Sequence, residues 1–240
     1  TSARAPIATV NVALSTTDSS KTMPAGTAFS TTVDDVSYQY VTIADITASG
    51  AGAEVKFNNV KIYEGTYITS KYLVDTSDVA QRFLLPDSRV DTSTLKVQVQ
   101  NSASDSTVAT YTKATDISQI SSTSSVYFLQ EVENGRHEVY FGDGNVSKAL
   151  SDGNIVILNY VVTNKTASNG ASTFSAPSTI DGVSDITVTT VSSAGGGAEP
   201  ESLASIKLQA PLDYASQGRA VTTDDYVTYT KKLFANTQAV

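Results

Sequence analysis

The sequence predicts a mainly β fold of the α+β class, with antiparallel, sandwich-like β-domains and a small helical part at the C-terminus. Short stretches of alternating apolar and polar residues recur between turn-forming residues, with a spacing of about 8–12 positions that is typical of sandwiches and barrels. The chain is rich in Thr and contains 12 tyrosines, residue types that suit a half-buried strand. Helical spacing appears only near the end. Hydrophobic residues make up 40% and charged residues 17% of the chain, which indicates a folded protein.

The first expected strands cover residues 5–14, 40–46, 53–65 and 66–74. Within 53–65, alternate residues up to Phe57 are apolar, but after Asn58-Asn59 the apolar set shifts by one position to Val60 and Ile62. Such a slip moves later side chains to the other face, so the pattern predicts a bulge at Asn58-Asn59. The Pro24-Ala25-Gly26 sequence predicts a tight turn before residue 40.

The second group of strands includes residues 95–100, which alternate strictly, and 155–162, where the first polar residue is Asn159. The latter pattern predicts a strand buried on both faces. The Phe141–Tyr160 stretch, which overlaps the start of this last strand, contains two Asp-Gly pairs. Counted from Asp143, the sixth residue of a calcium loop would be lysine and the twelfth asparagine, and a dinucleotide-binding fingerprint lacks its third glycine. The stretch therefore predicts a hairpin turn at a corner of the β-structure.

Helices are expected only after the glycine run Gly195–Gly197. Pro200 and Glu201 have the chemistry of a helix start, and Pro211 is expected to end this first helix. Leu203, Ile206 and Ala210 share one helical face. Thr223 is a candidate N-cap for a second helix with an apolar stripe, whose members are Tyr226, Thr230, Leu233 and Phe234.

Composition excludes several classes of function. The net charge of −8 and the lack of a basic cluster argue against nucleic acid and anionic membranes as partners. No apolar stretch approaches the roughly 18–20 residues that span a bilayer. The start of the chain does not resemble a signal peptide and is interpreted as a cut into a longer chain. The absence of cysteine excludes disulfides, thiol chemistry and cysteinyl metal sites.

Catalytic chemistry finds little support in the sequence. His137 is the single histidine and lies within a predicted strand, without a serine nucleophile motif elsewhere. Glu131, Glu133 and Glu138 lie on neighbouring predicted strands and could form a glycosidase carboxylate pair, but a solvated strand face is the preferred explanation. We therefore expect no catalytic residue, no metal ligand, no cofactor and no small-molecule substrate.

Three stretches resemble a known family: TMPAGTAFSTTVDDVSYQY (22–40), SSAGGGAEPESLASIKLQAPLDYASQGRAVTTDDYVTYTKKL (192–233), and the Phe141–Tyr160 block. The sequence resembles the baseplate wedge proteins of contractile-tailed phages related to T4, within the wider baseplate J-like family. The element from Arg219 to Tyr226 is the most specific part of this resemblance.

The resemblance implies a structural protein of the virion tail baseplate, assembled in the host cytoplasm. Such a protein connects wedges into a ring around the hub and accommodates the conformational change before sheath contraction. It implies other wedge proteins as neighbours and a homodimer or ring-forming homo-oligomer. A carbohydrate-binding or adhesin module of a tail fibre, and more weakly a cell-wall glycosidase using Glu131 or Glu133, are the alternatives.

Domain organisation is predicted from the same reasoning. Residues 1–76 and 166–195 are expected to form a discontinuous β-domain, 77–165 an inserted β-domain, and 196–240 a truncated helical segment. Gly195, Gly196 and Gly197 are the candidate hinge. The C-terminal stripe either packs on its own β-domain or forms a self-interface, whose candidate residues are Tyr226, Tyr229, Leu233 and Phe234.

Overall fold

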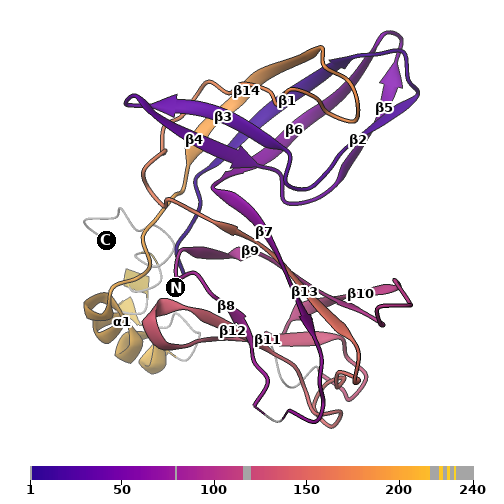
Figure 1. Cartoon of the computed structure of the whole chain (residues 1–240). Coiled ribbons are helices and arrows are strands. Elements are labelled where there is room, and N and C mark those ends of the chain that lie inside the picture. Colours follow the sequence, from indigo (N-terminus) through magenta and orange to yellow (C-terminus); the bar gives the residue numbers. More distant parts are fainter. Residues whose placement is uncertain are drawn as a thin grey trace. The chain divides into compact units, whose positions relative to one another are not determined.

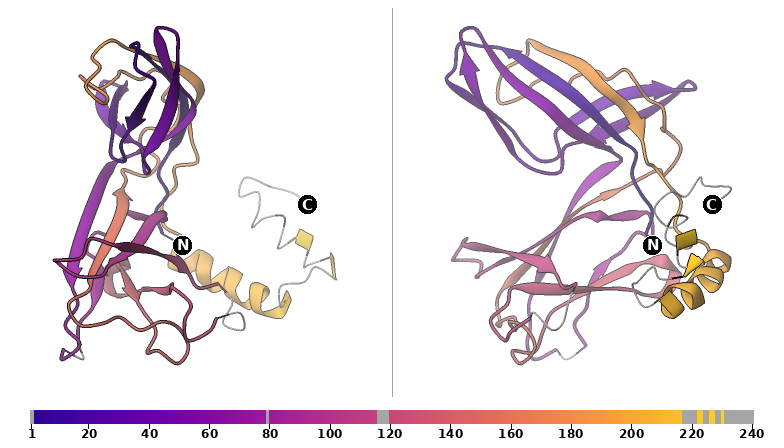
Figure 2. Two further views of the ribbon diagram at one scale, coloured as in Figure 1. Left: turned by 90° about the vertical axis from the view of Figure 1, so that its right-hand side faces the viewer. Right: turned by 180° about the vertical axis from the view of Figure 1, so that it is seen from behind.

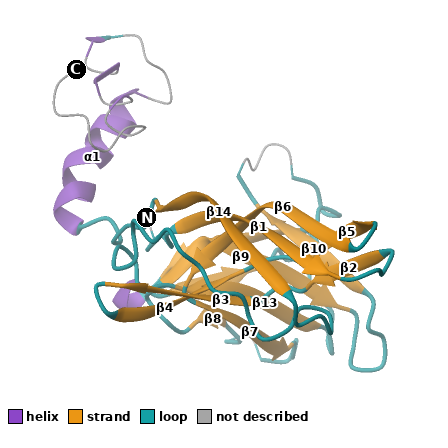
Figure 3. Cartoon of the chain, turned by 90° about the horizontal axis from the view of Figure 1, so that it is seen from above, coloured by secondary structure: helices purple, strands orange, loops and turns teal. Residues whose placement is uncertain are grey.

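Strands dominate the computed structural model, which describes residues 2–78, 80–115, 120–216, 222–223, 226–227 and 230. Within them lie fourteen strands, the helix α1 (Leu203–Ser216) and a short 3-10 turn at Glu133–Gly135. Figure 3 shows that strands are the main secondary structure of the described chain. The predicted mainly β class is confirmed.

The first sheet contains seven strands, in the order β14-β1-β6-β4-β3, with β5 pairing with β6 and β2 pairing with β5. Figure 1 shows this sheet in its upper half. All of its pairs are antiparallel. The strands are β1 (Ile7–Ser15), β2 (Ser20–Met23), β3 (Ala28–Val33), β4 (Val36–Val41), β5 (Ile46–Ala51), β6 (Glu54–Glu64) and β14 (Ile186–Gly195).

The core of the first sheet follows from strand alternation, since every second residue of β1 is buried. The segment before β14 adds Phe174 and Ile180, and Phe174 packs edge-on against Tyr40 with ring centroids 4.9 Å apart. The predicted bulge is confirmed: Asn59 has a φ of 54°, and the register between β1 and β6 shifts beside it. The predicted turn at Pro24 is confirmed by the hydrogen bond from Thr27 N to Pro24 O.

The second sheet also contains seven strands, in the order β7-β13-β9-β10-β11-β12-β8. Its pairs are antiparallel except for β10 and β11, which run parallel, a departure from the expected antiparallel arrangement. The strands are β7 (Thr66–Leu73), β8 (Phe83–Leu85), β9 (Val90–Gln100), β10 (Val108–Lys113), β11 (Val126–Glu131), β12 (His137–Tyr140) and β13 (Ile155–Val162).

The two ends of the second sheet come together, so the sheet is almost closed into a barrel. The Tyr72 hydroxyl on β7 donates a hydrogen bond of 2.6 Å to the Leu84 carbonyl on β8. The Gln81 amide donates one of 2.7 Å to the Leu73 carbonyl. As the apolar run predicts, β13 lies inside the sheet between β7 and β9, and its side chains from Val156 to Val161 are almost all buried.

Three local expectations differ from the structure. The Phe141–Tyr160 stretch is not a hairpin, because β12 and β13 are not neighbours in the sheet; residues 141–154 form a loop that crosses to a non-adjacent strand. Helix α1 continues past Pro211 to Ser216 and gives up only the hydrogen bond that a proline nitrogen cannot donate. Strand β7 belongs to the second sheet, so the sheets divide at Gly65 rather than at residue 76.

Residues Ser2–Glu199 form one compact unit, which we call the β-unit, and the residues from Pro200 onward form another. No described helix is long and apolar enough to cross a membrane.

Candidate functional site

The most elaborate polar structure in the β-unit is the junction between its two sheets. Three stretches of chain meet at this junction: residues 2–6, which lead into β1, Gly65, which joins β6 to β7, and residues 163–165, which follow β13. Residues 196–199, which follow β14, run beside them. Figure 2 shows these stretches between the two groups of strands. A side-chain network at this junction decides whether the sheets behave as one block.

Glu64, at the end of β6 in the first sheet, is fully buried. Its carboxylate accepts hydrogen bonds from the Thr163 hydroxyl at 2.6 Å and from the Asn164 backbone N–H and side-chain amide at 2.8 Å each. Thr163 and Asn164 directly follow β13 of the second sheet. A buried charge is stable only when its oxygens are well satisfied, so Glu64 ties the first sheet to the exit of the second.

Asp91 forms the reciprocal connection from β9 in the second sheet, and it is only 1% exposed. One oxygen accepts the Ala5 N–H at 2.9 Å, in the stretch that enters the first sheet. The other accepts the backbone N–H and hydroxyl of Ser93 at 2.9 and 2.6 Å. The Arg4 guanidinium lies 3.8 Å away. Each sheet thus presents one buried carboxylate to the chain that leads into or out of the other.

Gly65 allows the backbone between β6 and β7 to lie close to the backbone at the end of β13. Its φ of +123° is a conformation that other residues rarely adopt. A Cβ atom here would lie 2.2 Å from the Val162 carbonyl oxygen. Only glycine therefore fits the step from β6 to β7.

The glycine run is held to the β-unit by hydrogen bonds. Gly195 pairs with Ile7 at the end of β14, and Gly196 has a φ of +82°. The side chain of Asn169 both accepts the Gly197 N–H and donates to the Gly197 carbonyl, each at 3.0 Å. Ala198 exchanges two backbone hydrogen bonds with Arg4. Any rotation at the glycines must first break these contacts.

The C-terminal candidates for self-association are only partly described. Tyr226 is 59% exposed, whereas Tyr229, Leu233 and Phe234 lie outside the described residues. The apolar face of α1 is exposed within its own unit: Leu203 is 66% and Tyr214 is 85% exposed.

The acidic and histidine candidates are spread over the second sheet. Glu131 and Glu133 are exposed, and Glu138 forms an ion pair with Arg82. His137 is buried on β12, and its Nδ1 has no hydrogen-bond partner. Burial lowers the pKa of His137, and the facing Glu131 carboxylate acts in the opposite direction. Among the described residues, no cluster of three or more His, Asp and Glu side chains could hold a metal ion.

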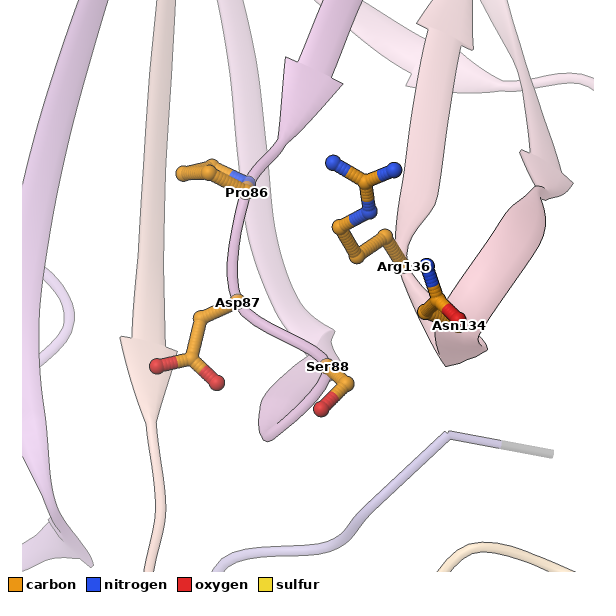
Figure 4. A pocket seen from close by; sticks show the side chains of 5 residues that line it. All are labelled: Pro86, Asp87, Ser88, Asn134 and Arg136. Atoms are coloured by element: carbon orange, nitrogen blue, oxygen red, sulfur yellow. The ribbon is translucent and has the colours of Figure 1, made fainter.

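A hollow of about 580 Å³ lies between the loop after β8 and the turn before β12. Figure 4 shows its lining side chains, with the guanidinium of Arg136 extending across the hollow towards Pro86. Arg136 donates to the Glu133 carbonyl at 3.3 Å. The remaining lining residues are Asp87, Ser88 and Asn134.

Comparison with known proteins finds one family model and one relative that are similar to this chain. Residues 68–175 match the family model of the third domain of the bacteriophage baseplate wedge protein gp6. Over these residues the chain is similar to the bacteriophage baseplate wedge proteins. The baseplate wedge protein gp6 of Enterobacteria phage T4 is 25% identical to this chain over an alignment of 242 residues. The alignment covers 90% of this chain and 35% of that protein. The chain thus spans about a third of its relative's length. The resemblance drawn from the motifs is confirmed, and the adhesin and glycosidase interpretations are not favoured.

The matched segment begins within β7 and includes β8 to β13, so it contains nearly the whole second sheet. Sequence reasoning missed both buried carboxylates of the junction. A signal for Glu64 was present, because it continues the inward-facing set of Val60 and Ile62 and directly precedes Gly65. A charged residue at an inward position of an alternating strand indicates a buried, hydrogen-bonded group.

Proposed function

We propose that this chain is a structural part of the phage tail baseplate. In this role it connects wedges into a ring around the hub and accommodates the change of shape that precedes sheath contraction. The proposal rests on the similarity to gp6 over 90% of the chain. It places the protein in the virion after assembly in the host cytoplasm, with other baseplate wedge proteins and further copies of itself as neighbours, and without a catalytic role.

The junction supports a mechanical role for the β-unit. A ring that changes shape needs subunits that transmit displacement without deforming, and packed, fully hydrogen-bonded units move as rigid bodies. Glu64 and Asp91 tie the two sheets in both directions. We therefore assign the discontinuous and inserted β-domains, divided at Gly65, to one rigid block.

Immunogold labelling of intact phage particles tests this role. With antibodies raised against the β-unit, gold should gather at the baseplate end of the tail in electron micrographs. Antibodies against a tail-fibre protein of the same phage provide the positional control. Gold along the fibres, or particles without gold despite labelling of the denatured protein on a blot, would contradict the proposal.

We further propose that Gly195–Gly197 is the hinge that leads from the β-unit to the helical segment, with Asn169 as its latch. The Asn169 side chain closes on both polar groups of the Gly197 backbone. Release of this contact frees the glycines, whose lack of a side chain permits wide rotation.

Asn169→Ala should accelerate amide hydrogen exchange at Gly197 by about fivefold, because the lost hydrogen bond contributes roughly 1 kcal/mol. Exchange in the core strand β13 should not change. Asn145→Ala, which removes an exposed asparagine in another loop, is the matched control. Unchanged exchange at Gly197, or faster exchange throughout the β-unit, would show that Asn169 does not latch a local hinge.

The C-terminal stripe is retained as a proposed self-interface. Tyr226, Tyr229, Leu233 and Phe234 would leave apolar surface in water unless a partner or the protein itself covers them. The variants Leu233→Asp and Phe234→Asp separate this interface from the one proposed below.

A further inference from the structure

Strand β14 leaves one of its edges unpaired. Figure 1 shows β14 beside β1 at the end of the first sheet. Ser15 N donates to the Asp185 carbonyl, and the register continues as Ala13 opposite Thr187 and Asn11 opposite Thr189. In an antiparallel pair, alternate residues direct their N–H and C=O groups away from the partner. Those of residues 186, 188 and 190 therefore point outward, where no described residue pairs with them.

The outer edge of β14 is occupied only near its end, where Ala194 exchanges hydrogen bonds of 2.8 Å with residues 170 and 171. A bulge at Val191 separates that part from the regular stretch, since Thr190 lies opposite Val10 and Ser192 opposite Thr9. The free and regular edge is thus residues 186–190.

The ends formed by β3, β7 and β8 are protected in ways that β14 is not. Ser30 on β3 exchanges two backbone hydrogen bonds with Ser175, at 3.1 and 2.8 Å. Strands β7 and β8 approach each other through Tyr72 and Gln81. Proteins usually guard open edges with charged residues, proline or a covering segment. Residues 186–195 contain neither a charged residue nor a proline.

The occupant that fits this edge is a second copy of the same strand. The outward groups at 186, 188 and 190 are symmetric about Val188. Antiparallel self-pairing therefore sets 188 opposite 188 and 186 opposite 190, with about six hydrogen bonds in three pairs. On the solvent face, Thr187 of one copy lies opposite Thr189 of the other, a β-branched pair that stabilises sheets. Two chains of net charge −8 would also meet through an uncharged segment.

We infer that two copies of this protein join through β14, with a two-fold axis at Val188 that extends the first sheet across the dimer. A two-fold contact of this kind closes on itself and does not propagate into fibres. A strand pair of five residues is smaller than a standard interface of about 1,600 Å², so the dimer should be weak and depend on concentration. The biological meaning of this contact rests on the proposed assembly role, but the contact itself is measurable with purified protein.

Light scattering on a size-exclusion column, over a concentration series of the full chain, tests the inference. The wild type should shift from monomer to dimer as its concentration rises. Thr187→Lys with Thr189→Lys should weaken dimerisation at least about tenfold, since like charges then lie opposite each other. Thr187→Glu with Thr189→Glu should do the same, and an equal mixture of the two double variants should recover the dimer.

Ser37→Lys with Gln39→Lys is the matched control, because it places the same charge on exposed positions of the internal strand β4 and should leave dimerisation unchanged. Thermal unfolding checks that every variant is folded. A wild type that stays monomeric overturns the inference. So does a dimer that survives the β14 lysines but is lost in Leu233→Asp or Phe234→Asp, and so does failure of the mixture to associate. Failure of the immunogold experiment would instead contradict the baseplate role and leave this result standing.

Discussion

Gly65→Ala is expected to lower the free energy of unfolding of the β-unit by more than about 3 kcal/mol. Two effects combine. Alanine is strained at a φ of +123°, and its Cβ would lie 2.2 Å from the Val162 carbonyl oxygen and 2.9 Å from a methyl carbon of Val161. Backbone on both sides of the sheet junction would have to move. Urea unfolding followed by circular dichroism measures the change.

Gly52→Ala is the matched control for this substitution. Gly52 also has a positive φ, of +69°, but a Cβ there would meet no atom within 4 Å. Gly52→Ala should lower the free energy of unfolding by only about 1 kcal/mol, the usual strain of a residue in the left-handed conformation. Equal losses in the two variants would show that backbone strain alone, and not the close approach of the chains at the junction, makes Gly65 necessary.

Glu64→Ala should lower the free energy of unfolding by about 2–3 kcal/mol, because it leaves one buried hydroxyl and two partly exposed donors without an acceptor. The Thr163 hydroxyl and both Asn164 donors lose their partner. Glu64→Gln keeps the shape of the side chain but replaces one acceptor oxygen with a donor. Its free energy of unfolding should therefore lie between those of the wild type and Glu64→Ala. Chemical denaturation of the three proteins gives the comparison.

Glu54→Ala controls for the loss of a glutamate from the same strand. Glu54 begins β6 and pairs with Lys56 at 2.7 Å, but both side chains are about half exposed. Exposed pairs of this kind contribute roughly 0–1 kcal/mol. A Glu64→Ala variant as stable as Glu54→Ala would mean that the buried carboxylate does not hold the sheets together.

Much of the local structure could be predicted from sequence because it depends on short-range rules. Alternation located β1 and β6, a continuous apolar run located β13, and the shift in alternation located the bulge at Asn59. The same rules failed at Phe141–Tyr160, where turn chemistry was recognised but the partner strand was not. A turn residue sets the local backbone angles and does not determine which strands become neighbours.

Pro211 illustrates a second kind of failure. A proline removes one helical hydrogen bond, and sequence reasoning treats it as an end. Helix α1 nevertheless runs from Leu203 to Ser216, because the other hydrogen bonds of a helix this long outweigh one missing bond. The self-interface candidates Tyr229, Leu233 and Phe234 and the glycine hinge stay predictions.

The sequence by itself determined the β class, many of the strands, the turn at Pro24 and the baseplate relationship, since each depends on residue type and spacing along the chain. Only the tertiary structure decided the order of the strands, the pairing of Glu64 with Thr163 and Asn164, the place of Asp91 and the free edge of β14. The contacts of Glu64 with Thr163 and Asn164, and of Asp91 with Ala5, join residues that lie 86 to 100 positions apart. Such contacts form through packing and burial of the whole unit, and no local pattern along the chain specifies which distant residues will meet.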